Sequence, residues 1–126
     1  MVDIAADMTA AAEDDFCYLT TAGRRTGQPH EIEIWFALDG RTLYLLSGGG
    51  DRSDWVRNLR SDAHVTVRLR DVAYEARARV VEDAEESERG RRLVFEKYQP
   101  RYRGSLERWR EESLLVAIDA ISPREE

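Results

Sequence analysis

An alternating stretch that ends in Asp39-Gly40 constrains the fold of this chain more than any other feature. Within residues 30–38 apolar side chains recur at every second position, as in a β-strand with one buried face: Ile32, Ile34, Phe36 and Leu38. Asp-Gly is a strong signal for a two-residue hairpin turn, so residues 41–47 are expected to fold back antiparallel on this strand. The apolar face should fill a barrel, while Trp35 lies on the opposite face, towards solvent, a partner subunit or a ligand.

Similar patterns elsewhere predict a mainly β, antiparallel fold with peripheral helices. Six strands are expected, at residues 16–21, 30–38, 41–47, 64–70, 74–81 and 114–121. Helices are expected at residues 53–60 and 83–98, and after Ser105. Residues 1–15 form an acidic, Ala-rich segment that is either a turn or two of helix or a frayed terminus, and residues 16–126 form one domain.

The charge balance and the scarcity of cysteine and histidine exclude several classes of function. The net charge is −6, and five of the 25 acidic residues fall in the first 15 positions, which leaves 20 acidic against 19 basic residues in the rest of the chain. General nucleic-acid binding needs a strongly basic face and is therefore not expected. Cys17 is the single cysteine, and His30 and His64 are the two histidines, so neither a disulfide nor a metal site is expected. A cytoplasmic location is expected, because there is no signal-peptide pattern and no apolar run of the ~20 residues that span a membrane.

Two glycine-bearing turns are candidates for binding a phosphate group. In the first, Gly23 and Gly27 permit positive φ, so that successive N–H groups can point at an anion, and Arg24 and Arg25 add charge. In the second, Gly48, Gly49 and Gly50 allow close approach of a ligand, and Ser53 or Asp54 can cap the helix that follows. The hairpin should bring Gly27 and Gly48 to the same end, which would make the two turns one site. Taken singly, each turn is also explained as a solvated hairpin turn or a flexible loop.

Three segments together carry a resemblance to a known family. Gly-Arg-Arg-Thr-Gly-Gln-Pro at residues 23–29, Ser-Gly-Gly-Gly at 47–50 and Asp-Trp-Val-Arg-Asn-Leu at 54–59 resemble the deazaflavin-dependent nitroreductases. These are the F420-using branch of the split β-barrel flavoproteins that include pyridoxamine-phosphate oxidases. The resemblance implies a six-stranded antiparallel split β-barrel of the FMN-binding type, usually dimeric, which holds F420 or FMN and passes hydride to a quinone, a nitro compound or an activated alkene.

The resemblance also implies roles for particular residues. The phosphate end of the cofactor would be held by Arg24, Arg25, Thr26 and Gly27, and its ring system would be bordered by Trp35, Ser47, Gly48, Gly49, Gly50 and Trp55. Tyr98 and Tyr102 match tyrosines that contact the substrate and can supply a proton, although packing at helical spacing explains them equally well. His30, Gly48 and Leu106 depart from residues found in some family members, which leaves cofactor affinity and substrate class open.

The chemistry is expected to come from the cofactor, because no Ser-His-Asp or Cys-His arrangement is recognisable. The leading hypothesis is an F420H2-dependent oxidoreductase. An FMN-dependent enzyme on the same fold, or a non-catalytic protein that binds a cofactor or hydrophobic ligand, is the alternative. A homodimer is expected, because a six-stranded barrel is filled by its own side chains and the cofactor must lie at its surface.

Overall fold

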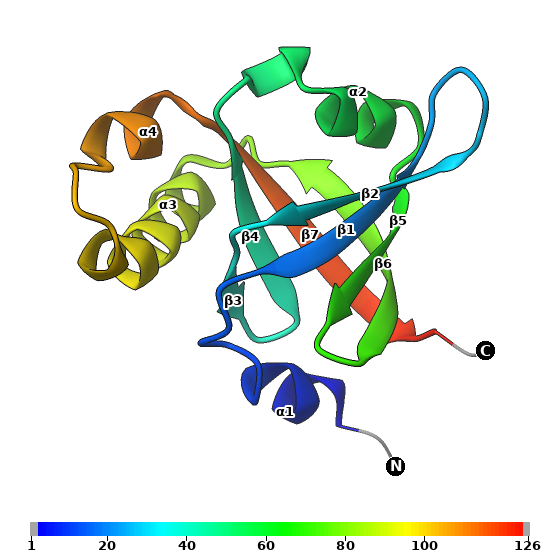
Figure 1. Cartoon of the computed structure of the whole chain (residues 1–126), viewed down its shortest axis with the longest axis horizontal. Coiled ribbons are helices and arrows are strands. Elements are labelled where there is room, and N and C mark those ends of the chain that lie inside the picture. Colours follow the sequence, from blue (N-terminus) through cyan, green and yellow to red (C-terminus); the bar gives the residue numbers. More distant parts are fainter. Residues whose placement is uncertain (1–2, 125–126) are drawn as a thin grey trace.

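The two edge strands of the sheet are consecutive in the chain but are not paired with one another, so the curled sheet forms a split barrel rather than a closed one. In the computed structural model, which describes residues 3–124, the strand order is β2-β1-β5-β6-β7-β4-β3 with antiparallel pairing throughout. The edge strands β2 and β3 are separated only by Trp35 and Phe36 (Figure 1). The strands are β1 (Cys17–Ala22), β2 (Pro29–Ile34), β3 (Ala37–Asp39), β4 (Thr42–Ser47), β5 (His64–Leu69), β6 (Val72–Val80) and β7 (Leu114–Pro123).

The expected strand at residues 30–38 is divided, so the sheet has seven strands rather than six. The Asp-Gly turn forms as predicted, with Gly40 at φ 63° and β3 paired to β4. The first part, β2, pairs instead with β1, so β2 and β4 are not neighbours. The chain turns at Phe36, where the N–H and C=O groups bind the hydroxyl of Tyr98. Because β2 and β4 do not pair, a hairpin of these two strands cannot be what brings the two glycine turns together.

The barrel is filled by the inward-facing side chains of its strands. As the alternation predicted, Phe36 lies in this core, and the fifth predicted strand contributes Tyr74, Ala76 and Ala78. A second cluster lies on the outside of β3, β4 and β7, under helix α3, and includes Ala37, Tyr44, Leu46, Val94, Tyr98, Leu115 and Ala117. Gly90 permits this close packing, because a Cβ there would lie 2.8 Å from the side chains of Tyr44 and Leu115.

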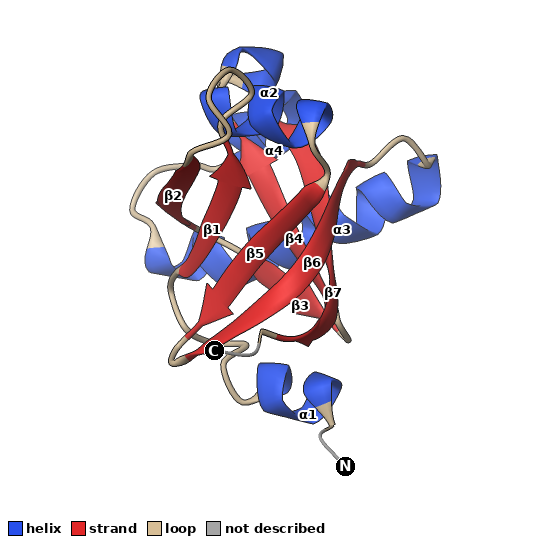
Figure 2. Ribbon diagram, turned by 90° about the vertical axis from the view of Figure 1, so that its right-hand side faces the viewer, coloured by secondary structure: helices blue, strands red, loops and turns tan. Residues whose placement is uncertain are grey.

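Helices lie along one side of the barrel and at both its upper and lower ends (Figures 1 and 2). They are α1 (Ile4–Thr9), η1 (Gly50–Arg52), α2 (Asp54–Ser61), α3 (Ala84–Tyr98), η2 (Gln99–Arg101) and α4 (Glu107–Glu112). As predicted, the Asp83 carboxylate caps α3 by accepting from the Glu86 N–H at 2.8 Å. Across residues 3–124, each helix is too short or too polar to pass through a bilayer.

The N-terminal segment is packed rather than frayed. Met8 of α1 and Ala11 are buried against the barrel core. Beyond them, the Asp14 carboxylate accepts two hydrogen bonds from the Arg70 guanidinium, at 2.8 and 3.0 Å. The described part of the 1–15 segment therefore packs against the barrel.

Candidate cofactor site

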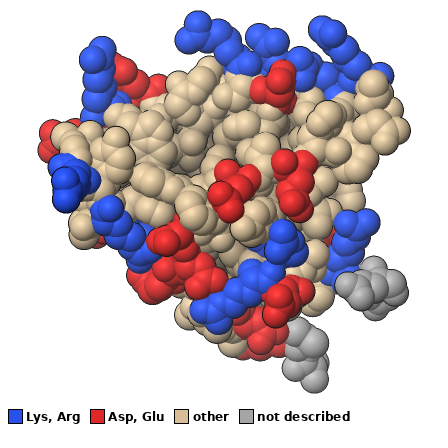
Figure 3. All heavy atoms as spheres, viewed as in Figure 1, with Lys and Arg blue, Asp and Glu red and all other residues tan. Residues whose placement is uncertain are grey.

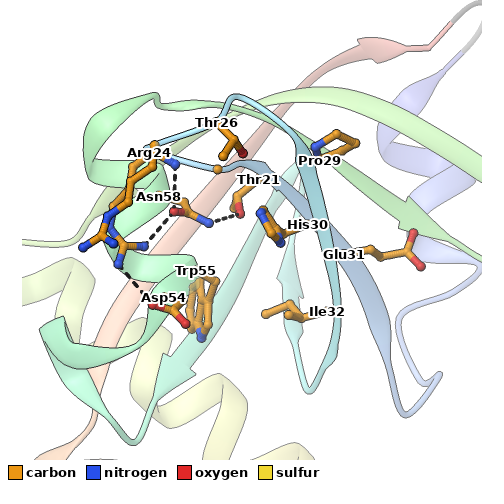
Figure 4. A pocket seen from close by; sticks show the side chains of 12 residues that line it. Thr21, Arg24, Thr26, Pro29, His30, Glu31, Ile32, Asp54, Trp55 and Asn58 are labelled. Atoms are coloured by element: carbon orange, nitrogen blue, oxygen red, sulfur yellow. Dashed lines mark hydrogen bonds and ion pairs between the residues drawn. The ribbon is translucent and has the colours of Figure 1, made fainter.

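A groove of about 630 Å³ lies between the β1–β2 turn, the start of β2 and helix α2 (Figure 4). Its size is that of a pocket for a cofactor or other small molecule. Five of the predicted site residues line it: Arg24, Arg25, Thr26, Asp54 and Trp55. The rest of its lining is Thr21, Gly23, Pro29, His30, Glu31, Ile32 and Asn58, of which Gly23 was expected as part of the first glycine turn.

Arg24 is held in place by helix α2. The side-chain oxygen of Asn58 accepts from both the backbone N–H of Arg24, at 3.2 Å, and its guanidinium, at 3.0 Å. Asn58 is itself buried and donates to the hydroxyl of Thr21 at 3.1 Å. A second guanidinium nitrogen of Arg24 pairs with the Asp54 carboxylate at 3.2 Å. The turn is therefore joined to α2 by these contacts rather than by strand pairing.

The expected row of inward N–H groups does not form in the first turn. Gly27 has φ 75°, as predicted, whereas the φ of Gly23 is not positive, and a Cβ there would lie 2.8 Å from His30 Nε2. The N–H groups of Gly23, Gly27 and Gln28 donate to acceptors within the turn, and that of Arg24 donates to Asn58. The positive charge of this end of the groove therefore comes from guanidinium groups.

The other end of the groove is flat and largely apolar. Figure 4 shows Trp55 of α2 and Ile32 of β2 near one another below the turn, with His30 above them and Glu31 directed away. Figure 3 shows basic side chains along the upper edge of the molecule, where α2 and the β1–β2 turn lie, and mostly uncharged surface below. A ligand with an anionic end and a planar ring system fits this combination.

The second glycine turn lies outside this groove and is fixed by its own contacts. The Ser47 hydroxyl lies 2.9 Å from the Ser53 hydroxyl and donates to the Gly50 carbonyl at 3.1 Å. Ser53 occupies the N-cap position of α2, but its hydroxyl makes no capping bond to the helix. Gly50 adopts φ 58°, and a Cβ at Gly49 would lie 2.6 Å from the Ser53 hydroxyl. The turn thus sets where α2 begins, and through α2 it sets the position of Arg24.

An aromatic cluster follows β2 beyond the groove. Trp35 is stacked on Tyr98, with ring centroids 4.3 Å apart and planes 4° apart. Tyr102 and Trp109 meet it edge-on, at 6.2 and 5.6 Å. Trp109 lies beside the second glycine turn, where a Cβ at Gly48 would be in van der Waals contact with its ring at 3.7 Å. Trp35 points away from the barrel core as predicted, but α3 of its own chain covers one face of the indole.

Tyr98 and Tyr102 differ sharply in exposure. Tyr98 is 2% exposed, and its hydroxyl accepts from the Phe36 N–H at 2.9 Å and donates its proton towards the carbonyls of Asp15 and Phe36, at 2.7 and 3.0 Å. Burial raises the pKa of Tyr98, while the bond with the Phe36 backbone opposes that shift. Tyr102 is 49% exposed. These contacts favour a packing role for the Tyr98 hydroxyl and leave that of Tyr102 accessible.

Comparison with solved structures defines the class of protein. A candidate pyridoxamine 5′-phosphate oxidase from Listeria innocua is 21% identical, with 94% of each chain covered and a TM-score of 0.70. A conserved hypothetical protein from Mycobacterium tuberculosis is 25% identical, with 99% of this chain and 85% of that chain covered and a TM-score of 0.72. An F420-H2 dependent reductase, FDR-A, is 17% identical, with 84% and 95% covered and a TM-score of 0.69. The fold is that of the split β-barrel proteins related to pyridoxamine-phosphate oxidases.

The sequence assigns the chain more narrowly. Residues 6–118 match the profile of the F420H2-dependent quinone reductases, and the chain belongs to this family. It is an F420H2-dependent oxidoreductase, as the resemblance in its glycine turns indicated.

Proposed function

We propose that this protein binds reduced F420 in the groove beside Arg24 and Trp55 and reduces a quinone held against Trp35, Tyr102 and Trp109. The observation that carries the proposal is the groove itself, in which a cationic end and a flat apolar end are joined by one helix, α2. Reduced deazaflavin supplies a hydride when bound. The chain's own residues bind the cofactor, orient it and present the acceptor.

Each end of the groove has a distinct task in this proposal. Arg24, oriented by Asn58, and Arg25 bind the phosphate of F420 through charge-assisted hydrogen bonds. Trp55 and Ile32 contact the ring system and exclude water from one of its faces. Trp35, which follows β2, and the Tyr102 and Trp109 rings that meet it edge-on offer edges and faces to a planar acceptor. Positioning of this kind can lower a barrier by ~7–11 kcal/mol without an acid or base from the protein.

A test should block the groove while leaving the barrel intact. His30→Trp places an indole in the groove at an exposed position of its lining, and Val72→Trp adds the same group at an exposed position that does not line it. We expect the first variant to weaken F420 binding at least tenfold, measured by quenching of F420 fluorescence, and the second to bind like the wild type. Equal binding by both variants would place the cofactor elsewhere.

The nature of the acceptor is tested by turnover. Anaerobic oxidation of F420H2 should be faster with menadione than with a nitroarene or an activated alkene of similar size. A protein isolated yellow with FMN would support the FMN alternative, and F420 binding without turnover on all three acceptors would support a non-catalytic role.

The proposal includes a homodimer in the cytoplasm. β2 is an edge strand, so its outer edge beside the groove has no strand paired to it within residues 3–124. A second subunit placed there would cover the open side of the groove. Sedimentation at micromolar concentration should show a dimer, and a monomer with full F420 affinity would contradict this part of the proposal.

A further inference from the structure

The side chain of Gln99 binds two points of the connection between helices α3 and α4 (Figure 1). Its amide nitrogen donates to the Gly104 carbonyl at 2.8 Å, and its amide oxygen accepts from the Leu106 N–H at 2.7 Å. A backbone carbonyl can only accept and a backbone N–H can only donate, so these partners fix the orientation of the amide. Gln99 itself is held at the end of α3, where its backbone N–H donates to the Phe95 carbonyl. It does not line the proposed F420 groove.

Two of the three aromatic rings proposed to hold the acceptor are attached to this connection. The N–H of Tyr102 donates to the Gln99 carbonyl at 3.2 Å, and its ring lies against Gly104, where a Cβ would come within 3.1 Å of it. Trp109 belongs to α4, whose N-cap position is the buried Leu106. The hydrogen bond to Gly104 therefore fixes the segment against which Tyr102 lies. The hydrogen bond from Leu106 fixes the start of the helix that carries Trp109.

From these contacts we propose that Gln99 is a positioning residue for the acceptor, because its amide holds Tyr102 and Trp109 in place. The two rings then stay edge-on to Trp35, with centroids 6.2 and 5.6 Å from it, and present a fixed surface to a planar quinone. Tyr102 is 49% exposed, so packing alone holds it weakly and the hydrogen bonds of Gln99 decide its position. The inference rests on the proposed function, because it assumes that the acceptor lies against these rings.

Gln99→Met tests the role of the amide, because it removes both hydrogen bonds while keeping a side chain of similar length. In steady-state assays with F420H2, the KM for menadione should rise about fivefold, the size of one aromatic contact, with kcat nearly unchanged. The affinity for F420, measured by fluorescence quenching, should equal that of the wild type. A merely structural role would lower the amount of folded enzyme, which reduces the apparent kcat and leaves KM as it was.

Gln99→Glu separates the two hydrogen bonds. At pH 7 its carboxylate can accept from the Leu106 N–H but cannot donate to the Gly104 carbonyl. We expect a smaller rise in KM, about twofold, which disappears in a Tyr102→Ala background. In that same background Gln99→Met should still raise KM, through Trp109.

The control and the remaining outcomes separate this inference from the proposed function. Glu96→Ala removes an exposed side chain from the last turn of α3 and should leave KM unchanged. An unchanged KM in Gln99→Met, or a rise that persists when Tyr102 and Trp109 are both replaced by Ala, would overturn the role of Gln99 and leave the proposed function in place. If Tyr102→Ala and Trp109→Ala themselves left the KM for menadione unchanged, the proposed acceptor site would be wrong, and this inference with it.

Discussion

Replacing Tyr98 by Phe separates a packing role for this residue from a catalytic one. The substitution removes one oxygen atom and retains the ring that stacks on Trp35 at 4.3 Å. It also leaves the Phe36 N–H, which donates to that oxygen at 2.9 Å, buried without its acceptor. The carbonyl of Asp15 loses a donor at 2.7 Å at the same time.

The expected cost is one of stability. A buried donor left unsatisfied costs about 1–3 kcal/mol, so the free energy of unfolding in urea should fall by that amount. Tyr102→Phe is the matched control, because that side chain is 49% exposed, and its effect should stay within about 0.5 kcal/mol. Turnover of the folded protein should change by less than about tenfold in either variant, equivalent to ~1.4 kcal/mol in the barrier. F420 affinity should stay constant in both.

The opposite pattern would refute this reasoning. If Tyr98→Phe unfolded at the wild-type urea concentration but turned over several hundredfold more slowly, its phenol would be an obligatory proton donor. The same loss in Tyr102→Phe would assign that role to Tyr102. It would contradict the proposal that the protein supplies no acid or base to the reaction.

Two further predictions concern charged groups. Replacing Arg24 and Arg25 together by Ala should weaken F420 binding by roughly 2–4 kcal/mol, and a fluorescence titration unchanged from the wild type would remove the site from consideration. Outside the groove, hydrogen bonds from Arg79 hold the pKa of Glu86 at about 2, so the stability that this pair contributes is complete above pH ~4.5 and is lost as the pH falls towards 2. Because Arg79 is partly exposed, the loss should be about 1–2 kcal/mol, and Glu86→Gln should flatten it in acid unfolding curves.

Strand alternation predicted which side chains face the barrel core, but it did not predict where the strand changes its partner. Alternation correctly assigned Phe36 to the barrel core and Trp35 to the opposite face, because side chains in a strand point to alternate sides. The same alternation continues without interruption through residues 30–38, so it gave no sign that the strand changes partner at Phe36. What divides it is a hydroxyl 62 residues away in sequence, and local periodicity carries no information about such a contact.

The candidate site shows the same limit. Arg24, Arg25 and Asp54 were expected because glycine, arginine and helix-start patterns are local, whereas Thr26 and Trp55 were expected from the family resemblance. Asn58 was missed, although it left a signal: it lies three residues after Trp55, on the apolar side of α2, where a polar group needs a buried partner. Which partner it takes depends on how the β1–β2 turn folds over the helix, 34 residues away in sequence. Tertiary packing, rather than any local preference, assembles this part of the site.

Lys97 offers a test of how the N-terminal segment is attached, because it is the only lysine in the chain. Its ammonium donates to the carbonyls of Asp14 and Phe36, at 2.7 and 2.8 Å. Burial, aided by Arg101, lowers the pKa of Lys97 to about 8. Between pH 8 and the unfolded value of ~10.4, the unfolded chain therefore binds more protons than the folded one. The contribution of Lys97 to the free energy of unfolding therefore rises with pH across that interval, by about 1–3 kcal/mol.

Cys17 acts in the opposite direction over nearly the same interval, so the wild-type profile alone is ambiguous. Burial raises the pKa of this thiol to about 12, whereas an unfolded cysteine ionises near ~8.5, so the unfolded chain loses its proton first and stability falls as the pH rises. The two contributions are separated by Lys97→Arg, which stays charged throughout, measured in a Cys17→Ala background by urea unfolding from pH 8 to 10. In that background the tyrosines whose pKa burial raises, Tyr98 among them, lower stability near pH 10 equally in both proteins, so the protein with Lys97 should gain stability with pH relative to Lys97→Arg. Parallel profiles would show that the ammonium is not desolvated, and that the contacts of Lys97 with Asp14 and Phe36 do not hold the segment against the barrel.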